Sequence, residues 1–233
     1  MSVVERLERL FEDTAARTNV HAHYLKKHIN EFSLNIGHNS FVLDIGCGKS
    51  PYKHILDFER YISIDINKAR DEDMVGDICN LPIKGNVVDL IVCTEVVEHV
   101  EDVDAALEEL NRVLKREGYL ILTMPLLMGV HDPVDFYRFT ELGSNVLLKR
   151  CGFEVIKMKK RGGIFASIGA IVSKVPYQVF APYDDRRNYP KYGILFLLYL
   201  LLIPLTKFFI AIDVFDKSKN YTLGYDVLCN KSI

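Results

Sequence analysis

The sequence lacks the cysteine pattern of a disulfide-rich or zinc-binding protein. Its five cysteines are odd in number and scattered, and no two form a C-x-x-C pair. A dense block of lysine and arginine is also missing, apart from Lys157 to Arg161, and the formal net charge is −2. The chain therefore has no general electrostatic attraction to a phosphate backbone, which argues against nucleic acid as a partner. The scattered thiols fit a reducing compartment.

An apolar signal-peptide core is absent as well. Met1 to Leu10 alternates charged and hydrophobic residues, so we expect no export signal and a cytoplasmic protein. No metal site is expected from His21, His23 and His28, because the first two would point to different sides of a helix. At 233 residues the chain suits one α/β domain with elaborations.

Four short apolar runs have the pattern of buried strands. They are Phe41 to Ile45, Tyr61 to Asp65, Val87 to Cys93 and Tyr119 to Met124. Between the last two runs, Asp102 to Arg116 carries one apolar stripe, with acidic residues at its start and a glycine after its end. This pattern predicts a crossover helix. Strands joined by such helices form a parallel sheet that is covered on both faces.

The flanking segments extend this plan. Apolar residues at helical spacing predict helices near the N-terminus, the second from about Asn19 to Phe32. A helix from Thr140 to Arg150 precedes a strand from Phe153 to Met158, and a final strand runs from about Tyr221 to Cys229. We therefore predict a Rossmann-like, mostly parallel seven-stranded sheet with helices on both faces. The single domain over 1–233 has N-terminal helices (1–38), a cofactor-binding core (39–160), an apolar helical insertion (161–219) and the final strand (220–233).

The first predicted strand runs directly into Gly46-Cys47-Gly48. Because glycine has no Cβ, the backbone of such a turn can approach a ligand closely. Asp65 ends the second strand, where a carboxylate can accept both hydroxyl hydrogens of a ribose, and ligands of open α/β sheets bind beyond the carboxyl ends of the strands. The two features together predict a nucleoside-containing ligand. A pyrophosphate cradle is disfavoured, because Pro51 stands where the third glycine of G-x-G-x-x-G would fall.

An ordered set of sequence motifs over residues 40 to 125 resembles those of class I methyltransferases, in the subgroup that includes ubiquinone/menaquinone-type and many small-molecule enzymes. The motifs are VLDIGCG at 42–48, IDI at 64–66, GDI at 76–78 with LP at 81–82, DLIVCT at 89–94 with EHV at 98–100, and the stretch 114–122. The sequence departs from the family pattern at Ser50, where members often carry a third glycine.

This resemblance implies S-adenosylmethionine as the cofactor and assigns its contacts residue by residue. Asp44, Gly46, Cys47 and Gly48 would line its methionine part, Asp65 its ribose, Ile66 its adenine face, Asp77 and Ile78 its adenine edge, and Thr94 the floor near the sulfonium.

Candidate residues for the acceptor follow the fourth and fifth predicted strands. Methyl transfer from a sulfonium is an in-line displacement, so the protein must align the acceptor and, for a hydroxyl, take up its proton. His99 and His131 are both candidate bases, since an imidazole has a suitable unperturbed pKa. For His99 a structural role in positioning the following helix is the alternative.

The stretch from His131 to Thr140 resembles one seen in methyltransferases associated with glycan and cell-envelope synthesis. Tyr137 and Arg138 are therefore further candidates for the catalytic site. Arg138 would hold a carboxylate or phosphate of the substrate by a two-pronged contact. Its alternative is an ion pair with Asp135 or Glu141.

An apolar stretch covers 192–212. A membrane span is disfavoured, because the stretch reaches the required length only by including Pro204 and Lys207. The final strand must also rejoin the sheet. Two interpretations remain: a helical lid or homodimer face, or an element that dips into a membrane surface between basic and aromatic flanks. The second implies a lipid-linked acceptor and a protein on the inner membrane face.

We therefore predict an S-adenosylmethionine-dependent methyltransferase that acts on a small or lipid-linked acceptor, such as a sugar hydroxyl. A nicotinamide-dependent oxidoreductase on a similar sheet and a non-catalytic, membrane-associated binding protein are the alternatives.

Overall fold

The computed structural model describes residues 19–67, 72–130, 132–180 and 189–232. The chain divides into two compact units. The larger holds Leu25–Arg161 and Gly224–Ile233, and the smaller holds Gly162–Leu223 and the chain up to Tyr24. The first of the two predicted N-terminal helices lies outside the described residues. The assignment of the whole chain to a single domain stays a prediction.

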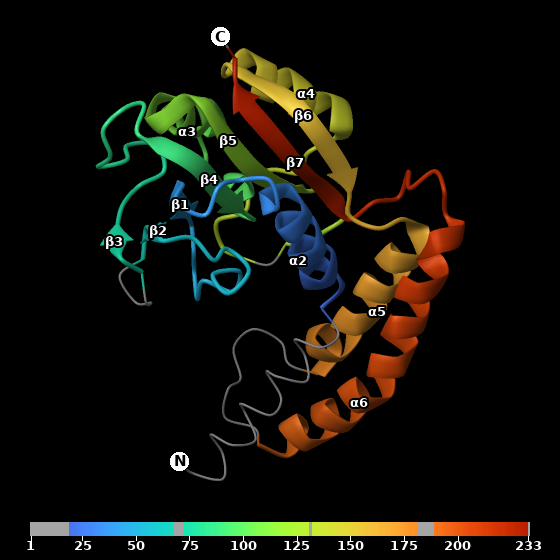
Figure 1. Ribbon diagram of the computed structural model, residues 1–233. Helices are drawn as coiled ribbons and strands as arrows, with labels where there is room; N and C mark the ends of the chain where they lie inside the picture. The colour runs from blue at the N-terminus through green and yellow to red at the C-terminus, as the bar shows by residue number, and fades with distance from the viewer. Residues whose placement is uncertain (1–18, 68–71, 131, 181–188, 233) are drawn as a thin grey trace. The chain divides into compact units, whose positions relative to one another are not determined.

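A seven-stranded sheet forms the centre of the larger unit (Figure 1). Its strands are β1 (Phe41–Ile45), β2 (Arg60–Asp65), β3 (Met74–Val75), β4 (Val88–Thr94), β5 (Leu114–Pro125), β6 (Phe153–Lys160) and β7 (Gly224–Lys231). The strand order is β3-β2-β1-β4-β5-β7-β6, and β7 is antiparallel to both of its neighbours while the other pairs are parallel. The predicted Rossmann-like, mostly parallel sheet is confirmed.

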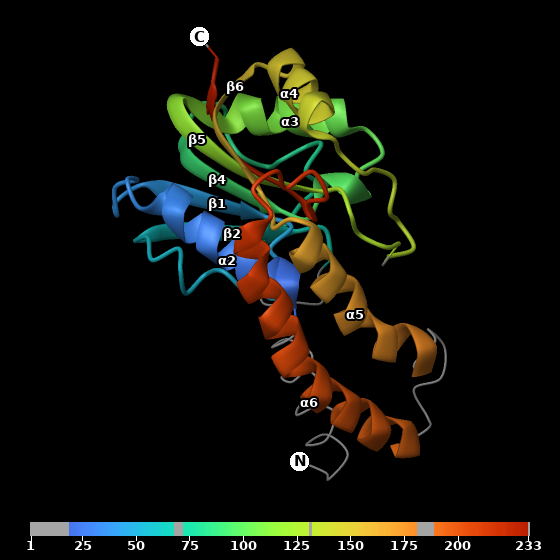
Figure 2. The same cartoon turned by 90° about the vertical axis from the view of Figure 1, so that its right-hand side faces the viewer.

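Helices cover both faces of this sheet (Figure 2). They are α2 (Val20–Ser33), α3 (Val103–Val113) and α4 (Glu141–Arg150), with a short 3-10 turn, η1 (Val97–His99), before α3. Successive strand residues point to opposite faces. Val42 accordingly packs with Leu25 and Ile29 of α2, whereas Leu43 packs in the cluster that contains Leu107 and Leu147 of α3 and α4. The core is thus two apolar layers, one on each side of the sheet.

Local chemistry explains where these helices begin. The side chain of Asp102 accepts a hydrogen bond from the Ala105 N–H at 3.0 Å, and Thr140 does the same for Gly143 at 3.2 Å. Both are N-caps that satisfy an orphan helix donor. The prediction that the first of these helices reaches Arg116 is wrong, because β5 begins at Leu114, which pairs with Val88 of β4. Burial of Leu114 and strand pairing outweigh the helical pattern there.

The smaller unit contains α5 (Ile164–Phe180), α6 (Tyr189–Ile212) and the 3-10 turn η2 (Asp213–Phe215). The predicted apolar stretch 192–212 lies in α6. Asp213 is buried and accepts hydrogen bonds from the backbone N–H groups of Gly163 and Ala166, so it satisfies the start of α5. Within the described part of the chain, no helix has both the length and the apolar character that a membrane span requires.

Candidate functional site

The predicted cofactor residues lie at one edge of the sheet. β1 is parallel to β2 and to β4, with Ile45 beside Ile64 on one side and Cys93 on the other. The carboxyl ends of these three strands therefore meet, and the turns that follow them are neighbours. This edge is where ligands bind in open α/β sheets.

The turn after β1 has the backbone that glycine favours. Gly46 and Gly48 have φ values of +62° and +53°. A Cβ on Gly46 would lie 2.3 Å from Val96 Cγ2, so no other residue fits there without displacing its neighbours. Ser50, where the family pattern often has a third glycine, also has a positive φ, +46°. The departure at Ser50 therefore leaves the left-handed backbone of the loop in place.

Asp65 joins the turns after β1 and β2. Its Oδ2 accepts a hydrogen bond from the Gly48 N–H and its Oδ1 accepts one from the Asn67 N–H, both at 2.9 Å. The residue is 7% exposed. The structure thus brings together the carboxylate and the glycine turn that were predicted to hold opposite parts of one ligand.

Asp44 lies beneath this turn on β1. It is buried and accepts a hydrogen bond from the hydroxyl of Tyr61 on β2. Burial raises the pKa of Asp44 to about 6, the nearby Asp65 carboxylate contributes in the same direction, and the Tyr61 hydrogen bond opposes the shift. Asp44 therefore carries a negative charge that the interior destabilises at neutral pH.

The remaining cofactor candidates differ in exposure. Ile66 is 65% exposed just beyond β2, where its side chain can contact the flat apolar face of a ligand. Asp77 is exposed and caps its own turn by accepting from the Cys79 N–H at 2.9 Å. Thr94 at the end of β4 is half-buried, whereas Cys47 and Ile78 are buried. The Ile78 side chain belongs to the core, so a contact of this residue with adenine would come from its backbone.

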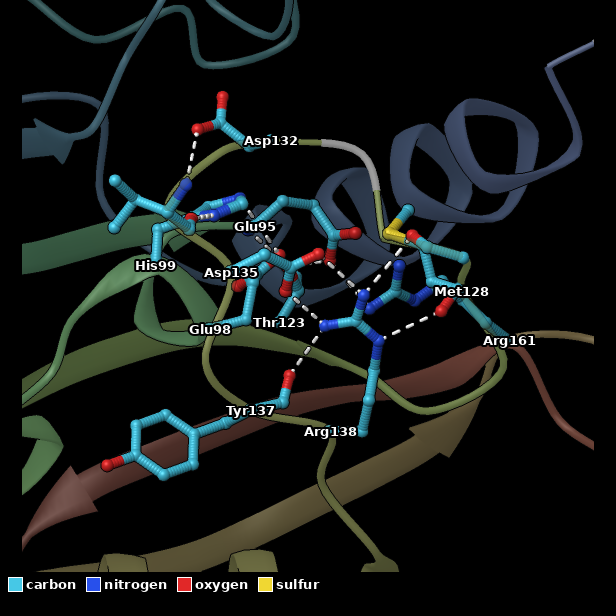
Figure 3. Close-up of polar contacts among 12 residues, drawn as sticks. Glu95, Glu98, His99, Thr123, Met128, Asp132, Asp135, Tyr137, Arg138 and Arg161 are labelled. Carbon is cyan, nitrogen blue, oxygen red and sulfur yellow. Dashed lines mark hydrogen bonds and ion pairs between the residues drawn. The ribbon is translucent and has the colours of Figure 1, made fainter. Parts of the chain in front are cut away.

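Sequence reasoning missed a charged cluster that surrounds the end of β4 (Figure 3). Glu95 has a φ of +54°, which is rare outside glycine. Its backbone N–H donates to Thr123 Oγ1, and the Thr123 hydroxyl donates to Glu95 Oε1, each at 2.9 Å. The Arg161 guanidinium lies 2.8 Å from the same carboxylate oxygen. Backbone strain held by side-chain contacts is a common feature of functional sites.

Arg161 connects this cluster to β7. The side chain is fully buried, and its Nε lies 2.8 Å from Oδ1 of Asp226. The other oxygen of Asp226 lies 2.6 Å from Nδ1 of His28 on α2. A buried guanidinium between two carboxylates compensates their charges. The sequence contained one signal for Arg161, its place at the end of the basic stretch that begins at Lys157.

His99 is held by the loop that follows β5. Its Nδ1 lies 2.5 Å from the backbone oxygen of Val134. A carbonyl oxygen only accepts hydrogen bonds, so Nδ1 carries the proton in the neutral ring and Nε2 carries the lone pair. Nε2 lies 3.8 Å from Oε1 of Glu98. The imidazole is therefore oriented with its basic nitrogen toward a carboxyl group.

Glu98 is a strongly perturbed acid within the cluster. Its side chain is fully buried, and neither carboxyl oxygen has a hydrogen-bond partner among the described residues. Burial raises the pKa of Glu98 to about 8, and the neighbouring Glu95 carboxylate adds to the shift, while Arg161 and Arg138 oppose it. The group is thus mainly a neutral acid at pH 7. Buried acids of this kind cluster at functional sites.

Arg138 is paired with Asp135, one of the two ion-pair partners considered from the sequence. It also donates from Nε to the Met128 carbonyl at 2.9 Å and from Nη2 to the Gly129 carbonyl at 3.2 Å (Figure 3). Arg138 therefore holds the loop after β5 in shape. A contact of its guanidinium with substrate stays a prediction.

The loop is also tied to η1. The Phe136 N–H donates to the Glu98 carbonyl at 2.8 Å, and the Tyr137 hydroxyl donates to the Glu101 carbonyl at 2.8 Å. His131, the other candidate base, lies outside the described residues.

A cleft of about 890 Å³ opens between the starts of α3 and α4. Tyr137 and Arg138 line it, together with Asp102 of the α3 cap and the apolar side chains of Leu142 and Val146 on α4. Ligand pockets have volumes of this order and a similar mixture of apolar walls and a few polar groups. Two of the predicted acceptor residues therefore border a hollow that is large enough for a small molecule.

Comparison with known proteins finds a family match over part of the chain. A family model described as a methyltransferase domain matches residues 43–122. An uncharacterized protein of Methanocaldococcus jannaschii is 37% identical over 90 residues, which cover 36% of this chain. The match spans 40% of that relative's length.

Solved structures show the same architecture. A SAM-dependent methyltransferase from Archaeoglobus fulgidus has a TM-score of 0.57 at 15% identity, over 90% of this chain and 94% of that one. The YcgJ protein from Bacillus subtilis has a TM-score of 0.57 at 14% identity, over 91% and 99%. The [4+2]-cyclase SpnF has a TM-score of 0.55 at 15% identity, over 90% and 80%.

Fold and sequence together define a class. The sheet is that of Rossmann-like methyltransferases, and residues 43–122 match the methyltransferase domain. S-adenosylmethionine is the cofactor that such a domain implies. The matched segment contains Gly46, Gly48, Asp65 and Thr94.

Proposed function

We propose that this chain is an S-adenosylmethionine-dependent methyltransferase that methylates a hydroxyl group of a small or lipid-linked acceptor, such as a sugar. The contact between Asp65 and the Gly48 N–H carries the proposal, because it unites the acidic end of β2 with the glycine turn after β1 inside the matched domain. The residues present fit this cofactor, since the positive φ values of Gly46 and Gly48 turn the backbone beside the Asp65 carboxylate, which accepts from the Gly48 N–H. Bound there, it supplies an electrophilic methyl group on a sulfonium.

Within this proposal, the contacts are assigned as follows. Asp65 accepts the ribose hydroxyls, the Asp44–Gly48 turn lines the methionine part, and Ile66 covers the adenine face, with Asp77 and Ile78 at its edge. Thr94 forms the floor near the sulfonium. Membership of the ubiquinone/menaquinone-type small-molecule subgroup, with similarity to the enzymes of glycan and cell-envelope synthesis, is part of the proposal too.

Proton removal falls to His99. The Val134 carbonyl fixes the proton on Nδ1, so Nε2 can take the acceptor's hydroxyl proton while the oxygen bonds to the methyl carbon. His99 would thereby take up the one proton that the transfer releases, since the cofactor would leave as a neutral thioether. Glu98 is mainly neutral at pH 7, so it places no full negative charge beside Nε2 of His99.

Isothermal titration tests cofactor binding directly. We expect binding of S-adenosylmethionine and of its demethylated product S-adenosylhomocysteine, and none of NAD. Failure to bind either sulfur compound at high micromolar concentration would remove the proposal, and binding of NAD instead would favour the oxidoreductase.

A matched pair of variants tests the base. His99→Ala should slow transfer of labelled methyl to a lipid or small-molecule extract by about 10²-fold or more, with cofactor affinity retained. His38→Ala is the control, because its Nδ1 also lies 2.5 Å from a backbone carbonyl oxygen, that of Asp57. Equal rates for the two variants would assign His99 a structural role. Absence of methyl transfer by the wild type, with cofactor binding intact, would instead favour a non-catalytic binding protein.

Peripheral membrane contact through 192–212 is the second part of the proposal. The apolar character of this stretch supports it, and a lipid-linked acceptor would then be delivered in the membrane plane. A helical lid and a homodimer face are the competing assignments.

A further inference from the structure

The α5–α6 hairpin buries small side chains where a water-soluble helix pair buries large ones. Every described residue of α5 that is buried is small; these residues are Ala166, Ser167, Gly169, Ala170 and Ser173. A Cβ on Gly169 would lie 3.0 Å from Cβ of Phe209 on α6, which shows that the two helices approach closely at this point. On α5, the seam of the hairpin is thus made by small residues.

The large aliphatic residues of α5 form a stripe on its outer face. Ile164, Ile168, Ile171 and Val175 follow one another at steps of four, three and four, and they are 38, 37, 64 and 47% exposed. Residues at this spacing lie on one side of a helix. The exposed face of α5 is therefore its apolar face.

The pattern is the same on α6. Among its described side chains, Thr206 is the one that is buried, at 1% exposure. Leu197 and Leu201 are 61 and 71% exposed, and Phe208 is 55% exposed. A polar residue thus faces inward while leucine and phenylalanine face outward.

Water does not favour this inverted arrangement. Burial of a large aliphatic side chain is favourable in water, so a hairpin that folds in water should turn these residues inward. In lipid, exposing large aliphatic side chains on the outer face costs no free energy of hydration. Helices there associate through small residues that let their backbones approach closely. The packing of the hairpin therefore points to hydrocarbon as the medium around its outer face.

We propose that the outer face of the α5–α6 hairpin inserts into one leaflet of a phospholipid bilayer, and that the lipid-contacting surface includes the α5 stripe as well as 192–212. The chain leaves the sheet after β6 and returns into β7, and the Arg161 N–H donates to the Gly224 carbonyl at 2.9 Å. Both ends of the hairpin are thus on one side of the membrane. The exposed lysines Lys174 and Lys207 can extend to anionic headgroups.

This inference rests on the membrane part of the proposed function and is independent of methyl transfer. Its test is flotation of the full-length protein with vesicles of phosphatidylcholine and phosphatidylglycerol at 3:1. The variant Ile171→Asp/Leu201→Asp should reduce the bound fraction at least tenfold. Leu34→Asp is the matched control, because Leu34 is 69% exposed in the larger unit and should bind like the wild type. All these positions are exposed, so folding should be retained, which circular dichroism checks.

Depth can be measured because the chain contains no tryptophan. Ile171→Trp should show a blue-shifted emission on vesicles and quenching by brominated acyl chains, whereas Leu34→Trp should show neither. Absence of vesicle binding by the wild type would overturn the inference. So would a homodimer in the absence of lipid that dissociates in the double Asp variant. Cofactor titration of the same variants separates the two proposals, since vesicle binding without cofactor binding would remove only the methyltransferase activity.

Discussion

The carboxylate of Asp65 accepts a hydrogen bond from the backbone N–H of Gly48, with 2.9 Å between the nitrogen and Oδ2. A donor after β1 and an acceptor at the end of β2 are therefore joined across two neighbouring strands. This single contact links the cofactor's two predicted anchoring points, and a bound ribose would share the same carboxylate.

Replacement of Asp65 should weaken cofactor binding. Asp65→Ala removes a charged acceptor, whose hydrogen bonds are worth about 1.5–3 kcal/mol, so the dissociation constant for S-adenosylmethionine should rise roughly 10- to 100-fold. Isothermal titration measures it, with Glu108→Gln on the exposed side of α3 as the control. Unchanged affinity in a folded Asp65→Ala protein would contradict the assignment of the ribose to this residue.

Gly46→Ala tests the cradle from the backbone side. The new methyl group would lie 2.3 Å from Val96 Cγ2 at a φ of +62°, so we expect a loss of unfolding free energy of about 1–3 kcal/mol together with weaker cofactor binding. Adding Val96→Ala should restore the unfolding free energy that is lost through the clash, but not the free energy that is lost through the positive φ. Urea titration of the single and double variants separates these two contributions. Gly129→Ala is the comparison, since its Cβ meets nothing within 4 Å, and equal stability of both alanine variants would refute this account.

Glu98→Gln should change how stability depends on pH. Between the ordinary glutamate pKa of 4.5 and the folded value of about 8, the native protein holds a proton that the unfolded chain has released. The wild type should therefore lose stability as pH rises through this window, whereas the neutral amide does not titrate. The unfolding free energy of the variant minus that of the wild type should increase by up to about 1.4 kcal/mol per pH unit. Urea titrations at pH 5.5, 7 and 8.5 measure it, and a difference that stays flat would show that Glu98 ionises normally.

Arg161→Met should be strongly destabilising. The substitution leaves Glu95 and Asp226 without their buried counter-charge, and breaking such a pair typically costs about 3–5 kcal/mol. Arg150→Met is the matched control, because the Arg150–Asp104 ion pair is exposed and should change stability little. Chemical unfolding compares the two variants. Similar midpoints would mean that the buried network is dispensable.

Several elements followed from local sequence because local chemistry decides them. The bounds of β1 were predicted correctly, since a run of five buried positions, four of them apolar, ends at a glycine turn. Asp102 and Thr140 begin helices because their side chains satisfy nearby N–H groups. The positive φ of Gly46 and Gly48 agrees with the close-approach turn predicted there.

Other features depended on segments that are distant in sequence. β3 has two residues, too few for any periodicity, and it exists because Met74 and Val75 pair with β2. A helical stripe through Leu114 predicted helix, but pairing with β4 made strand.

The sequence by itself determined the class of fold and the residues at the carboxyl edge of the sheet, because alternation, capping and glycine turns act between near neighbours along the chain. Only the tertiary structure decided that Arg161 and Glu95 lie 2.8 Å apart, that Glu98 is buried, and that α5 turns its small residues inward. The sequence shows which kind of partner a charged or apolar side chain can have. Which residue becomes that partner depends on the distant segments that folding brings into contact with it.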